Sequence, residues 1–395
     1  MERPEIKEAN LQPLPTGRDS DYDIAIVGAG PAGSSAAIRL ALAGKRVVLV
    51  EKEKFPRHKL CGEFISPECR DHFDELGVHD AMREAGGVEI AKTIFYSRSG
   101  KGVEVPSPDL SGVGSAHKHA LGLSRAEMDM LLIARARQVG VDVFEETSVV
   151  DLLQENDTVV GVKTRARDIR ARVTLDGSGR MRILARRASS GDGIRKAEFV
   201  AFKTHVSGCG VCEDTCEIFS YRRGYGGSSR VESGLHNLCF IAAAADVKQL
   251  GSDPERVLRE IVCTNKRAAE VFKEINFVGE WHAVGIERYG RGEIAPQLGL
   301  LTIGDSAAFI DPFTGSGMLL ALESARVAVE AIVTTDNLAA LAEDYSRRYS
   351  ATFDKRLRMC SLLRRVSLVP LLAETTIRAL ALSSGVRRLI VRATR

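Results

Sequence analysis

The sequence is poor in several features that would point to specialised classes of protein. One tryptophan occurs among 395 residues, and aromatic residues make up only 6%. No apolar run reaches the roughly 18 to 20 residues that a membrane-spanning helix needs. The formal net charge is +3, which is too small to indicate nucleic acid as the main partner. Eight cysteines are scattered through the long chain, so we expect reduced thiols and a cytoplasmic protein.

The two ends of the chain differ from its middle. Residues 1–20 are polar, contain prolines and lack the apolar segment of a signal peptide, so we expect a mobile leader. Residues 346–395 hold twelve Lys or Arg and two Asp or Glu, and arginines alternate there with apolar blocks. This pattern is typical of helices packed on the protein body or lying on a membrane surface. We therefore expect a helical basic tail over 336–395, which either packs on the protein body or makes peripheral contact with a membrane.

Residues 22–52 form the most informative segment of the sequence. An apolar strand is followed by Gly28, Gly30 and Gly33 in G-x-G-x-x-G spacing, then by a helix and a second strand that ends at Glu51. In such a βαβ unit the glycines admit a pyrophosphate at the helix N-terminus, and the acidic residue accepts hydrogen bonds from a ribose. The nucleotide contacts predicted here are Gly28, Gly30, Pro31, Ala32, Gly33, Glu51 and Lys52.

The remainder of the chain alternates strands and helices. Ser124 and Glu127 form a capping box that predicts a helix start. Strands are expected around 141–144 and 159–164, and residues 197–243 have the alternation and glycine-rich turns of an antiparallel sheet. The pattern predicts an α/β fold, in which a Rossmann-type domain is combined with a discontinuous substrate domain built on a mixed sheet.

Four features together carry a family resemblance. They are the glycines at 28–33, Arg125 in "LSRAEMD", the Asp176-Gly177 step, and Gly304-Asp305 followed by "FIDPFTGSG". Over residues 22 to about 335 the chain resembles the FAD-dependent oxidoreductases that include p-hydroxybenzoate hydroxylase-like monooxygenases and geranylgeranyl reductases. The steps "CGEFISPE" and "GDSAAFIDPFTGSG" resemble the geranylgeranyl reductase branch most.

The resemblance implies a non-covalent FAD and a set of residues that contact it. Asp305 would bind the ribityl chain, and the residues after it would lie along the flavin, with a helix N-terminus aimed at its pyrimidine end. No second dinucleotide motif is present, so NAD(P)H is expected as a transient reductant. The further cofactor contacts expected are Cys61, Gly62, Arg125, Asp176, Gly177, Gly304, Asp305, Pro312, Gly315, Ser316, Gly317 and Met318.

Two residues are predicted to act in catalysis. The resemblance places Cys61 and Gly62 beside the isoalloxazine ring, where Cys61 would be a small wall of the reaction chamber or a proton donor. A buried structural thiol is the alternative for Cys61. Tyr225, in a glycine-rich turn, is expected to line the substrate pocket or to pack in a strand.

The pattern also predicts how the domains divide the chain. The FAD-binding domain is expected to comprise 21–84, 120–184 and 296–335, and the substrate domain 85–119 and 185–295. No obligate protein partner is inferred, and the expected substrate is a small apolar molecule.

The expected reaction is that of a monooxygenase, with a reductase as the alternative. The geranylgeranyl reductases carry a Tyr-x-Trp-x-Phe-Pro signature, whereas this chain has Tyr221 and Tyr225 without a tryptophan or Phe-Pro between them. This difference favours a monooxygenase that hydroxylates or epoxidises an aromatic, polyketide or lipid-like substrate. The Cys-Gly step favours the alternative, a reductase of carbon–carbon double bonds in a prenyl or quinone-type lipid. A non-catalytic electron-transfer flavoprotein is a weaker reading.

Three other patterns are weaker pointers to function. Flavin-dependent halogenases carry a Trp-x-Trp-x-Ile-Pro signature that Trp281 alone cannot supply, although Lys59 could stand in for a halogenating lysine. His117 and His119 are either acid–base groups or exposed loop residues. The cluster of His205, Cys209, Cys212 and Cys216 is either a metal site or a simple surface loop. We predict no bound metal there.

Overall fold

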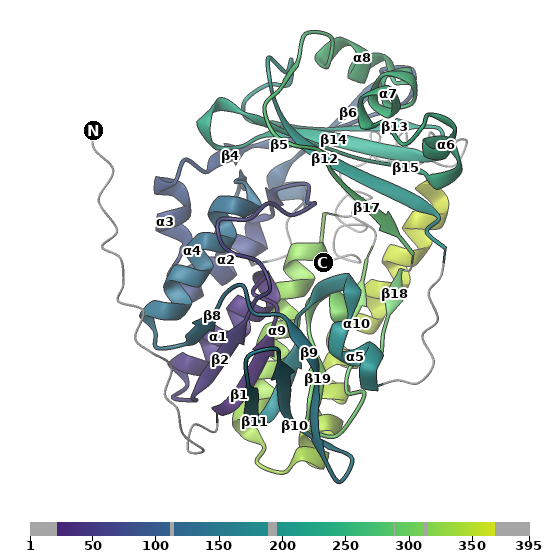
Figure 1. The fold of residues 1–395 in the computed structure, drawn as a ribbon. Coiled ribbons are helices and arrows are strands. Elements are labelled where there is room, and N and C mark those ends of the chain that lie inside the picture. Colours follow the sequence, from purple (N-terminus) through teal and green to yellow (C-terminus); the bar gives the residue numbers. More distant parts are fainter. Residues whose placement is uncertain (1–21, 111–113, 189–195, 288, 311–314, 368–395) are drawn as a thin grey trace.

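The computed structural model describes residues 22–110, 114–188, 196–287, 289–310 and 315–367. The expected leader at 1–20, Pro312 and the end of the basic tail lie outside these residues. Two large sheets and a set of helices make up the described part, and Figure 1 shows the second sheet lying across one end of the unit built on the first.

The first large sheet is the α/β unit that the glycine motif predicts. Its strand order is β8-β2-β1-β11-β10-β9, and β19 pairs with β11. Strands β1, β2, β8, β11 and β19 run parallel, and β9 and β10 complete the sheet as antiparallel neighbours. The bounds are β1 Tyr22–Val27, β2 Val47–Val50, β8 Asp142–Phe144, β9 Val149–Glu155, β10 Thr158–Thr164, β11 Asp168–Asp176 and β19 Leu300–Thr302.

Helices cover this sheet, which explains the continuous apolar character of its central strands. Helix α1 (Pro31–Leu42) packs against both α4 (Arg125–Gln138) and α9 (Gly317–Thr334). The capping box is confirmed in part, because the Ser124 hydroxyl accepts a hydrogen bond from the Glu127 backbone N–H at 3.2 Å. Ser66 is the N-cap residue of helix α2 (Pro67–Leu76), and Pro67 is its first residue.

The second large sheet has the order β16-β12-β15-β14-β13-β5-β6, with β17 beside β12. Neighbouring strands are antiparallel except β5 and β13, which run parallel. Its bounds are β5 Lys92–Tyr96, β6 Gly102–Pro106, β12 Phe199–Ser207, β13 Thr215–Tyr221, β14 Gly224–Arg230, β15 His236–Ala243, β16 Asn276–Phe277 and β17 His282–Ile286. A small third sheet is formed by β3 (Phe64–Ile65), β7 (Ala120–Gly122) and β4 (Val88–Ile90), with β7 in the middle.

The two faces of the second sheet have different partners. Phe202, Val206 and Phe240 point to one face and pack with residues of α7 (Pro254–Glu260) and α8 (Lys266–Val271), the helices above the sheet in Figure 1. Because side chains alternate along a strand, Lys203 and His205 on β12 point to the opposite face. That inner face is turned toward the first unit and carries the candidate site.

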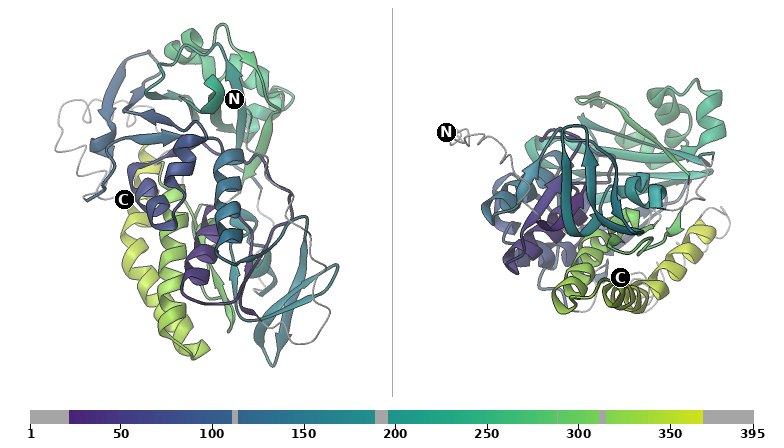
Figure 2. Two further views of the ribbon diagram at one scale, coloured as in Figure 1. Left: turned by 90° about the vertical axis from the view of Figure 1, so that its left-hand side faces the viewer. Right: turned by 60° about the horizontal axis from the view of Figure 1, so that its bottom comes forward.

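Helix α10 (Leu338–Ser367) begins the expected basic tail and packs beside α9, as both views in Figure 2 show. Tyr345, Tyr349 and Phe353 form its fully buried stripe. Arg356 is paired with Glu323 of α9. The described part of the tail is therefore an amphipathic helix docked on the body.

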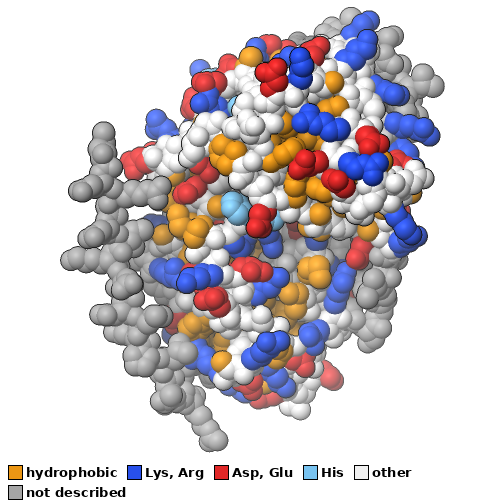
Figure 3. Space-filling model, turned by 45° about the horizontal axis from the view of Figure 1, so that its top comes forward, with side chains coloured by type: hydrophobic (Ala, Val, Ile, Leu, Met, Phe, Trp, Pro, Cys, Tyr) orange, Lys and Arg blue, Asp and Glu red, His pale blue; other side chains and the backbone are white. Residues whose placement is uncertain are grey.

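The surface mixes charges of both signs. On the face in Figure 3, acidic and basic side chains alternate with scattered hydrophobic ones. Within the described ranges, no helix is both long enough and apolar enough to cross a membrane.

Candidate active site

The glycines of the first βαβ unit fall into two groups. A side chain at Gly28 would collide with the Gly177 carbonyl, and one at Gly33 would collide with the Gly28 carbonyl. Gly28 also has a φ of +97°, which a residue with a Cβ rarely adopts. Both positions need glycine because β1, α1 and the end of β11 meet there without intervening side chains.

The second group of glycines lines open space. A Cβ at Gly30 would have only the Arg125 guanidinium near it, at 3.7 Å, and one at Gly62 or Gly317 would meet nothing within 4 Å. Backbone left bare in this way, at the start of α1 and of α9, is suited to phosphate and ring groups of a bound dinucleotide. The residues present therefore fit FAD.

Glu51 lies at the carboxyl end of β2, as predicted, and is 6% exposed. One carboxylate oxygen accepts the Ala29 N–H at 2.9 Å, and the other accepts the Glu53 N–H at 3.2 Å. Arg57 contacts the same carboxylate at 3.4 Å. The side chain is thus fixed at the edge of the nucleotide position, whereas Lys52 is exposed and paired with Glu53 at 3.2 Å.

Arg125 is buried at the start of α4. Its guanidinium donates two hydrogen bonds to Asp129, at 2.9 and 2.7 Å. Burial disfavours the charged form, but the Asp129 carboxylate outweighs burial and raises the pKa of Arg125. Asp129 also contacts Arg57 at 3.0 Å, so this carboxylate ties together two cations beside Gly30.

Asp176 ends β11 and is fully buried. Its carboxylate receives the backbone N–H groups of Leu184 and Ala185 at 3.0 and 2.9 Å, and the hydroxyls of Ser178 and Ser306. With its oxygens engaged in this way, the side chain stabilises the turn after β11. The neighbouring Gly177 is the residue that contacts the Gly28 turn.

The Gly304-Asp305 step follows β19 directly. Gly304 has a φ of +60° and its N–H donates to the Ser324 hydroxyl of α9 at 2.8 Å. Burial raises the pKa of Asp305 to about 6, although the charges of Arg180 and Arg125 act in the opposite direction. A carboxyl desolvated in this way would gain from hydrogen bonds donated by a ribityl chain.

The residues expected along the flavin sit at the start of α9. Gly315 has a φ of +60°, Ser316 is the N-cap residue and Gly317 is the first helical residue. Met318 is partly buried against the main core. The helix is opened by Gly315–Gly317 as the sequence predicts, so its N-terminal N–H groups would face a bound group there.

Cys61 lies in the loop between β2 and β3 and is partly buried. Its sulfur accepts the Glu63 N–H at 3.4 Å, and its carbonyl accepts a hydrogen bond from the Asn237 side chain on β15 at 3.2 Å. The side-chain amide oxygen of Asn237 is buried and has no hydrogen-bond partner among the described residues. The Cys61-Gly62 step is therefore held against the inner face of the second sheet, beside an unused acceptor.

Glu63, which the sequence analysis did not single out, is the centre of a buried charge cluster. Its side chain is fully buried and accepts hydrogen bonds from Lys203 and from the Arg125 N–H, the latter at 2.8 Å. His205 Nε2 lies 2.7 Å from the other carboxylate oxygen. Burial alone would raise the pKa of Glu63, but the contacts with His205 and Lys203 hold that pKa below its ordinary value.

The backbone at Glu63 is strained. Its φ is +52°, a left-handed conformation that costs a non-glycine residue roughly 1–2 kcal/mol. Strain of this kind persists where surrounding contacts over-determine it, which happens often at functional sites. Here Lys203 and His205, both from β12, fix Glu63 from the second sheet. We call Glu63, Lys203 and His205 the buried cluster.

Two further histidines lead away from the buried cluster. The His58 ring lies 5.9 Å from that of His205 and 5.6 Å from that of His282, centroid to centroid. Desolvation and the charge of Lys203 lower the pKa of both His58 and His282. His282 pairs with Lys203 across the β12–β17 ladder, so all three imidazoles lie at the polar half of the inner face.

The other half of the same face is apolar. Ala201, Ile241 and Ile286 form a small cluster there, against which Tyr225 and Leu60 pack. Tyr289 and Phe309 stack with ring centroids 5.2 Å apart at its border. Tyr225 thus lies on the inner face, as a pocket-lining residue would, and its catalytic role stays a prediction.

The cysteine cluster of the sequence analysis does not assemble in the structure. His205 is committed to Glu63, Cys209 lies near Ser228, and Cys216 is buried in a different cluster. Burial raises the pKa of Cys216 to about 12. Within the described ranges, the possible ligand atoms that lie close enough together to hold a metal ion belong instead to Asp74, His79 and His117, within 4.8 Å of one another.

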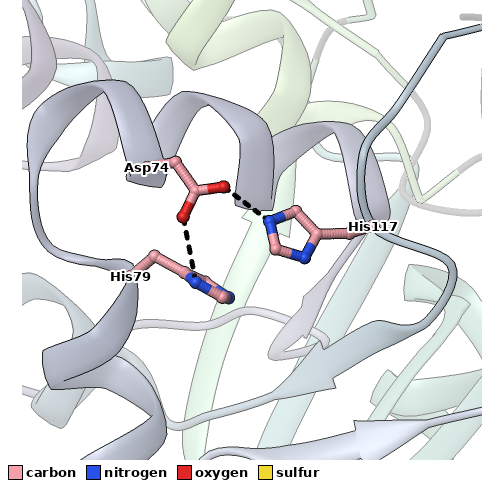
Figure 4. A group of neighbouring side chains, drawn as sticks. All are labelled: Asp74, His79 and His117. Atoms are coloured by element: carbon pink, nitrogen blue, oxygen red, sulfur yellow. Dashed lines mark hydrogen bonds and ion pairs between the residues drawn. The ribbon is translucent and has the colours of Figure 1, made fainter.

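Those three residues, which we call the surface cluster, form a hydrogen-bonded bridge (Figure 4). One Asp74 oxygen lies 3.0 Å from His79 Nδ1 and the other lies 2.6 Å from His117 Nε2. Arg70 Nε donates to His79 Nε2 at 3.0 Å, which places the imidazole proton on Nδ1. A metal ion would need that Nδ1 lone pair, so the hydrogen bonding opposes metal binding at His79. The companion residue His119 pairs with Glu89 at 3.1 Å.

Sequence signals for the buried cluster were present but weak. Lys203 and His205 stand at alternate positions in "FVAFKTHVS", an otherwise apolar strand, which indicates two polar side chains on one sheet face. Glu63 lies within the "CGEFISPE" step. Nothing local in the sequence shows that these residues meet across 140 positions of chain.

Comparison with known proteins supports the assignment of the cofactor. Residues 21–176 match the family model of the FAD binding domain. A 1H-pyrrole-2-carbonyl-[peptidyl-carrier protein] chlorinase of Pseudomonas fluorescens is 25% identical over 355 residues, 80% of this chain and 78% of that protein. Digeranylgeranylglycerophospholipid reductase 2 of Methanopyrus kandleri is 28% identical over 356 residues, 85% of this chain and 84% of that protein.

A solved structure shows the same fold. The flavin-dependent brominase Bmp2 superposes with a TM-score of 0.79 at 22% identity, covering 94% of each chain. Together with the open glycines, the fixed Glu51 and the desolvated Asp305, the match to the FAD binding domain identifies the cofactor. The chain is a flavoprotein with an FAD-binding domain, and it resembles the geranylgeranyl reductases within the p-hydroxybenzoate hydroxylase-like FAD-dependent enzymes.

Proposed function

We propose that the protein is an FAD-dependent reductase of a carbon–carbon double bond in an apolar, prenyl- or quinone-type substrate. The main support for this proposal is that the inner face of the second sheet, beside the Cys61-Gly62 step, is divided into an apolar half and a polar half. Its apolar half presents Ala201, Ile241 and Ile286, and its polar half presents Lys203 and His205 on Glu63. Reduction of a double bond needs these two environments next to each other: one for an apolar chain and one that supplies a proton.

Each part of the site has a role in this scheme. When bound, FAD supplies two electrons and one proton as a hydride, and NAD(P)H restores it. The apolar half would hold the substrate chain out of water, with Tyr225 and Leu60 at its border. The buried cluster would hold the second proton, which the other carbon of the double bond must receive. The Methanopyrus relative is named for a reductase of such a lipid.

A monooxygenase acting on an apolar or aromatic substrate is the second candidate. The stacked rings of Tyr289 and Phe309 at the apolar half favour it, because aromatic surfaces accommodate a flat ring. The absence of the prenyl signature between Tyr221 and Tyr225 also favours it.

Anaerobic reduction followed by admission of air separates the two candidates. A reductase should saturate a prenyl lipid or prenylquinone under argon, and air should oxidise its flavin rapidly with release of peroxide. A monooxygenase should leave those substrates unchanged under argon and form an oxygenated flavin absorbance that lasts for seconds. The latter outcome would overturn the reductase proposal.

An apolar lipid substrate would also explain a basic tail. We propose that the basic segment 346–395 brings the protein to anionic lipid surfaces in the cytoplasm. Co-sedimentation with anionic liposomes should then fall as salt is raised. Equal binding to neutral and anionic vesicles, or none, would leave the tail with only the packing role seen for α10.

A further inference from the structure

Two further imidazoles lie next to the buried cluster, and both are more exposed than His205. Glu63 is 0%, Lys203 1% and His205 8% exposed. His282 is partly buried and His58 is exposed. The five side chains come from three parts of the fold: the loop between β2 and β3, strand β12 and strand β17.

The spacing of these rings suits proton transfer. His205 is directly hydrogen-bonded to Glu63 at 2.7 Å. The His58 ring stands 5.9 Å from His205 and 5.6 Å from His282, centroid to centroid, a separation that one water molecule can bridge. Imidazole can accept a proton on one nitrogen and release one from the other. A sequence of such groups, ending at a carboxylate, can therefore pass protons without moving the backbone.

We propose that His282, His58 and His205 form a path that delivers protons from solvent to the Glu63–Lys203 pair beside the Cys61-Gly62 step. This inference rests on the proposed function, because it names the source of the proton that a reduced double bond takes up. The charge balance is simple: each proton leaving the buried cluster is replaced by one from water through the three imidazoles.

The electrostatic surroundings keep the outer members able to accept protons at neutral pH. Desolvation is the largest effect that lowers the pKa of His58 and of His282, followed for both by the charge of Lys203. Glu232 faces His58 and Glu280 faces His282, and each acts to raise the pKa of its neighbour. Both imidazoles are therefore predominantly neutral at pH 7 and can take a proton from water and pass it inward.

Proton uptake on reduction of the bound flavin tests the path without any substrate. Flavin reduction consumes protons from water, so a pH-indicator dye can follow uptake after anaerobic flash photoreduction of the FAD-loaded protein. Relative to the native protein, His205→Gln should slow uptake at least tenfold, and His58→Gln or His282→Gln at least threefold. Added imidazole should restore the rate in the two outer variants, because it can replace the missing relay group.

His119→Gln serves as the matched control, because this histidine also pairs with a carboxylate but lies outside the path. It should take up protons at the native rate. If all three path variants do the same, the proposal is wrong. If His205→Gln fails to fold, the proton-uptake rates of His58→Gln and His282→Gln still test the path.

A titration of the FAD-free protein gives an independent readout. In NMR spectra of the histidine rings, His58→Gln should raise the pKa of His282, because the His58 charge contributes to lowering it. An unchanged titration of His282 would show that the two rings are not coupled and would contradict the path. Neither experiment depends on a double bond, so the path can fail while the reductase proposal stands, and the reverse also holds.

Discussion

The two histidine–carboxylate clusters of this molecule contain similar groups in opposite surroundings. In the surface cluster, the Asp74 side chain is 48% exposed and bridges two histidines. In the buried cluster, the Glu63 side chain is fully buried and bridges His205 and Lys203. Solvent screens the charge of the Asp74 carboxylate, whereas the charge of the buried Glu63 carboxylate is balanced only by neighbouring protein groups.

Residue types alone therefore do not mark a functional site. By residue types and spacing, the surface cluster looks the better ligand set. Its hydrogen bonds involve residues that are close in sequence, because Arg70, nine positions before His79, donates a hydrogen bond to the second ring nitrogen of that histidine. The buried cluster joins the loop between β2 and β3 to strand β12, where the Glu63 backbone is strained and the Cys61-Gly62 step is fixed. Backbone strain of this kind is often found at functional sites, where the exact position of a side chain matters.

The largest expected difference concerns stability. Glu63→Gln removes the partner of a buried cation, so the free energy of unfolding should fall by about 3–5 kcal/mol. Asp74→Asn breaks contacts at a half-exposed site and should cost only about 0–1 kcal/mol. Urea unfolding of both variants measures this contrast. Equal losses would remove the distinction between the clusters.

A second prediction uses cofactor retention. Glu51→Ala removes a charge-assisted acceptor at the nucleotide and should weaken FAD binding by about 1.5–3 kcal/mol, giving a largely colourless protein, and Asp305→Ala should behave alike. Asp74→Asn should keep its yellow absorbance. Flavin content after gel filtration is the measurement, and full colour in both site variants would refute their assignment.

The pH dependence of stability sharpens the comparison further. The pKa of His79 is lowered from 6.5, chiefly by burial, so its contribution is present above pH 6.5 and is lost as pH falls through the lower folded value. The pKa of Glu63 is lowered from 4.5, so its contribution persists to pH 4.5 and is lost below. His79→Asn should therefore change the pH dependence of the melting temperature between pH 7 and 5. Glu63→Gln should change it between pH 4.5 and 3. The reverse pattern would contradict both directions.

The smallest expected effect is that of zinc. Added Zn²⁺ should not raise the melting temperature of the native protein, because Arg70 holds His79 in the tautomer that cannot ligate at Nδ1. Arg70→Met frees that ring, and zinc should then stabilise the variant. Stabilisation of the native protein by zinc would show that the surface cluster is a metal site after all.

Local patterns sufficed for the first unit of the fold. The strand before Gly28, the helix from Pro31 and the strand ending at Glu51 appear as predicted, because each is dictated by nearby residues. Strand β9 was missed, since its mixed polar pattern at the sheet edge resembles a connection. The residues predicted for catalysis, Cys61 and Tyr225, lie on or beside the inner face, and their roles await experiment.

Local sequence patterns were enough to predict that the chain binds a dinucleotide, because the glycine spacing and the acidic residue after the second strand build that unit from nearby residues. The packing of the two large sheets, in contrast, brings Glu63 to Lys203 and His205, and it keeps Cys209 and Cys216 away from a metal-binding partner among the described residues. The physical reason is that a buried charge is tolerable only with its partner, and partners separated by 140 residues are chosen by how the two sheets pack.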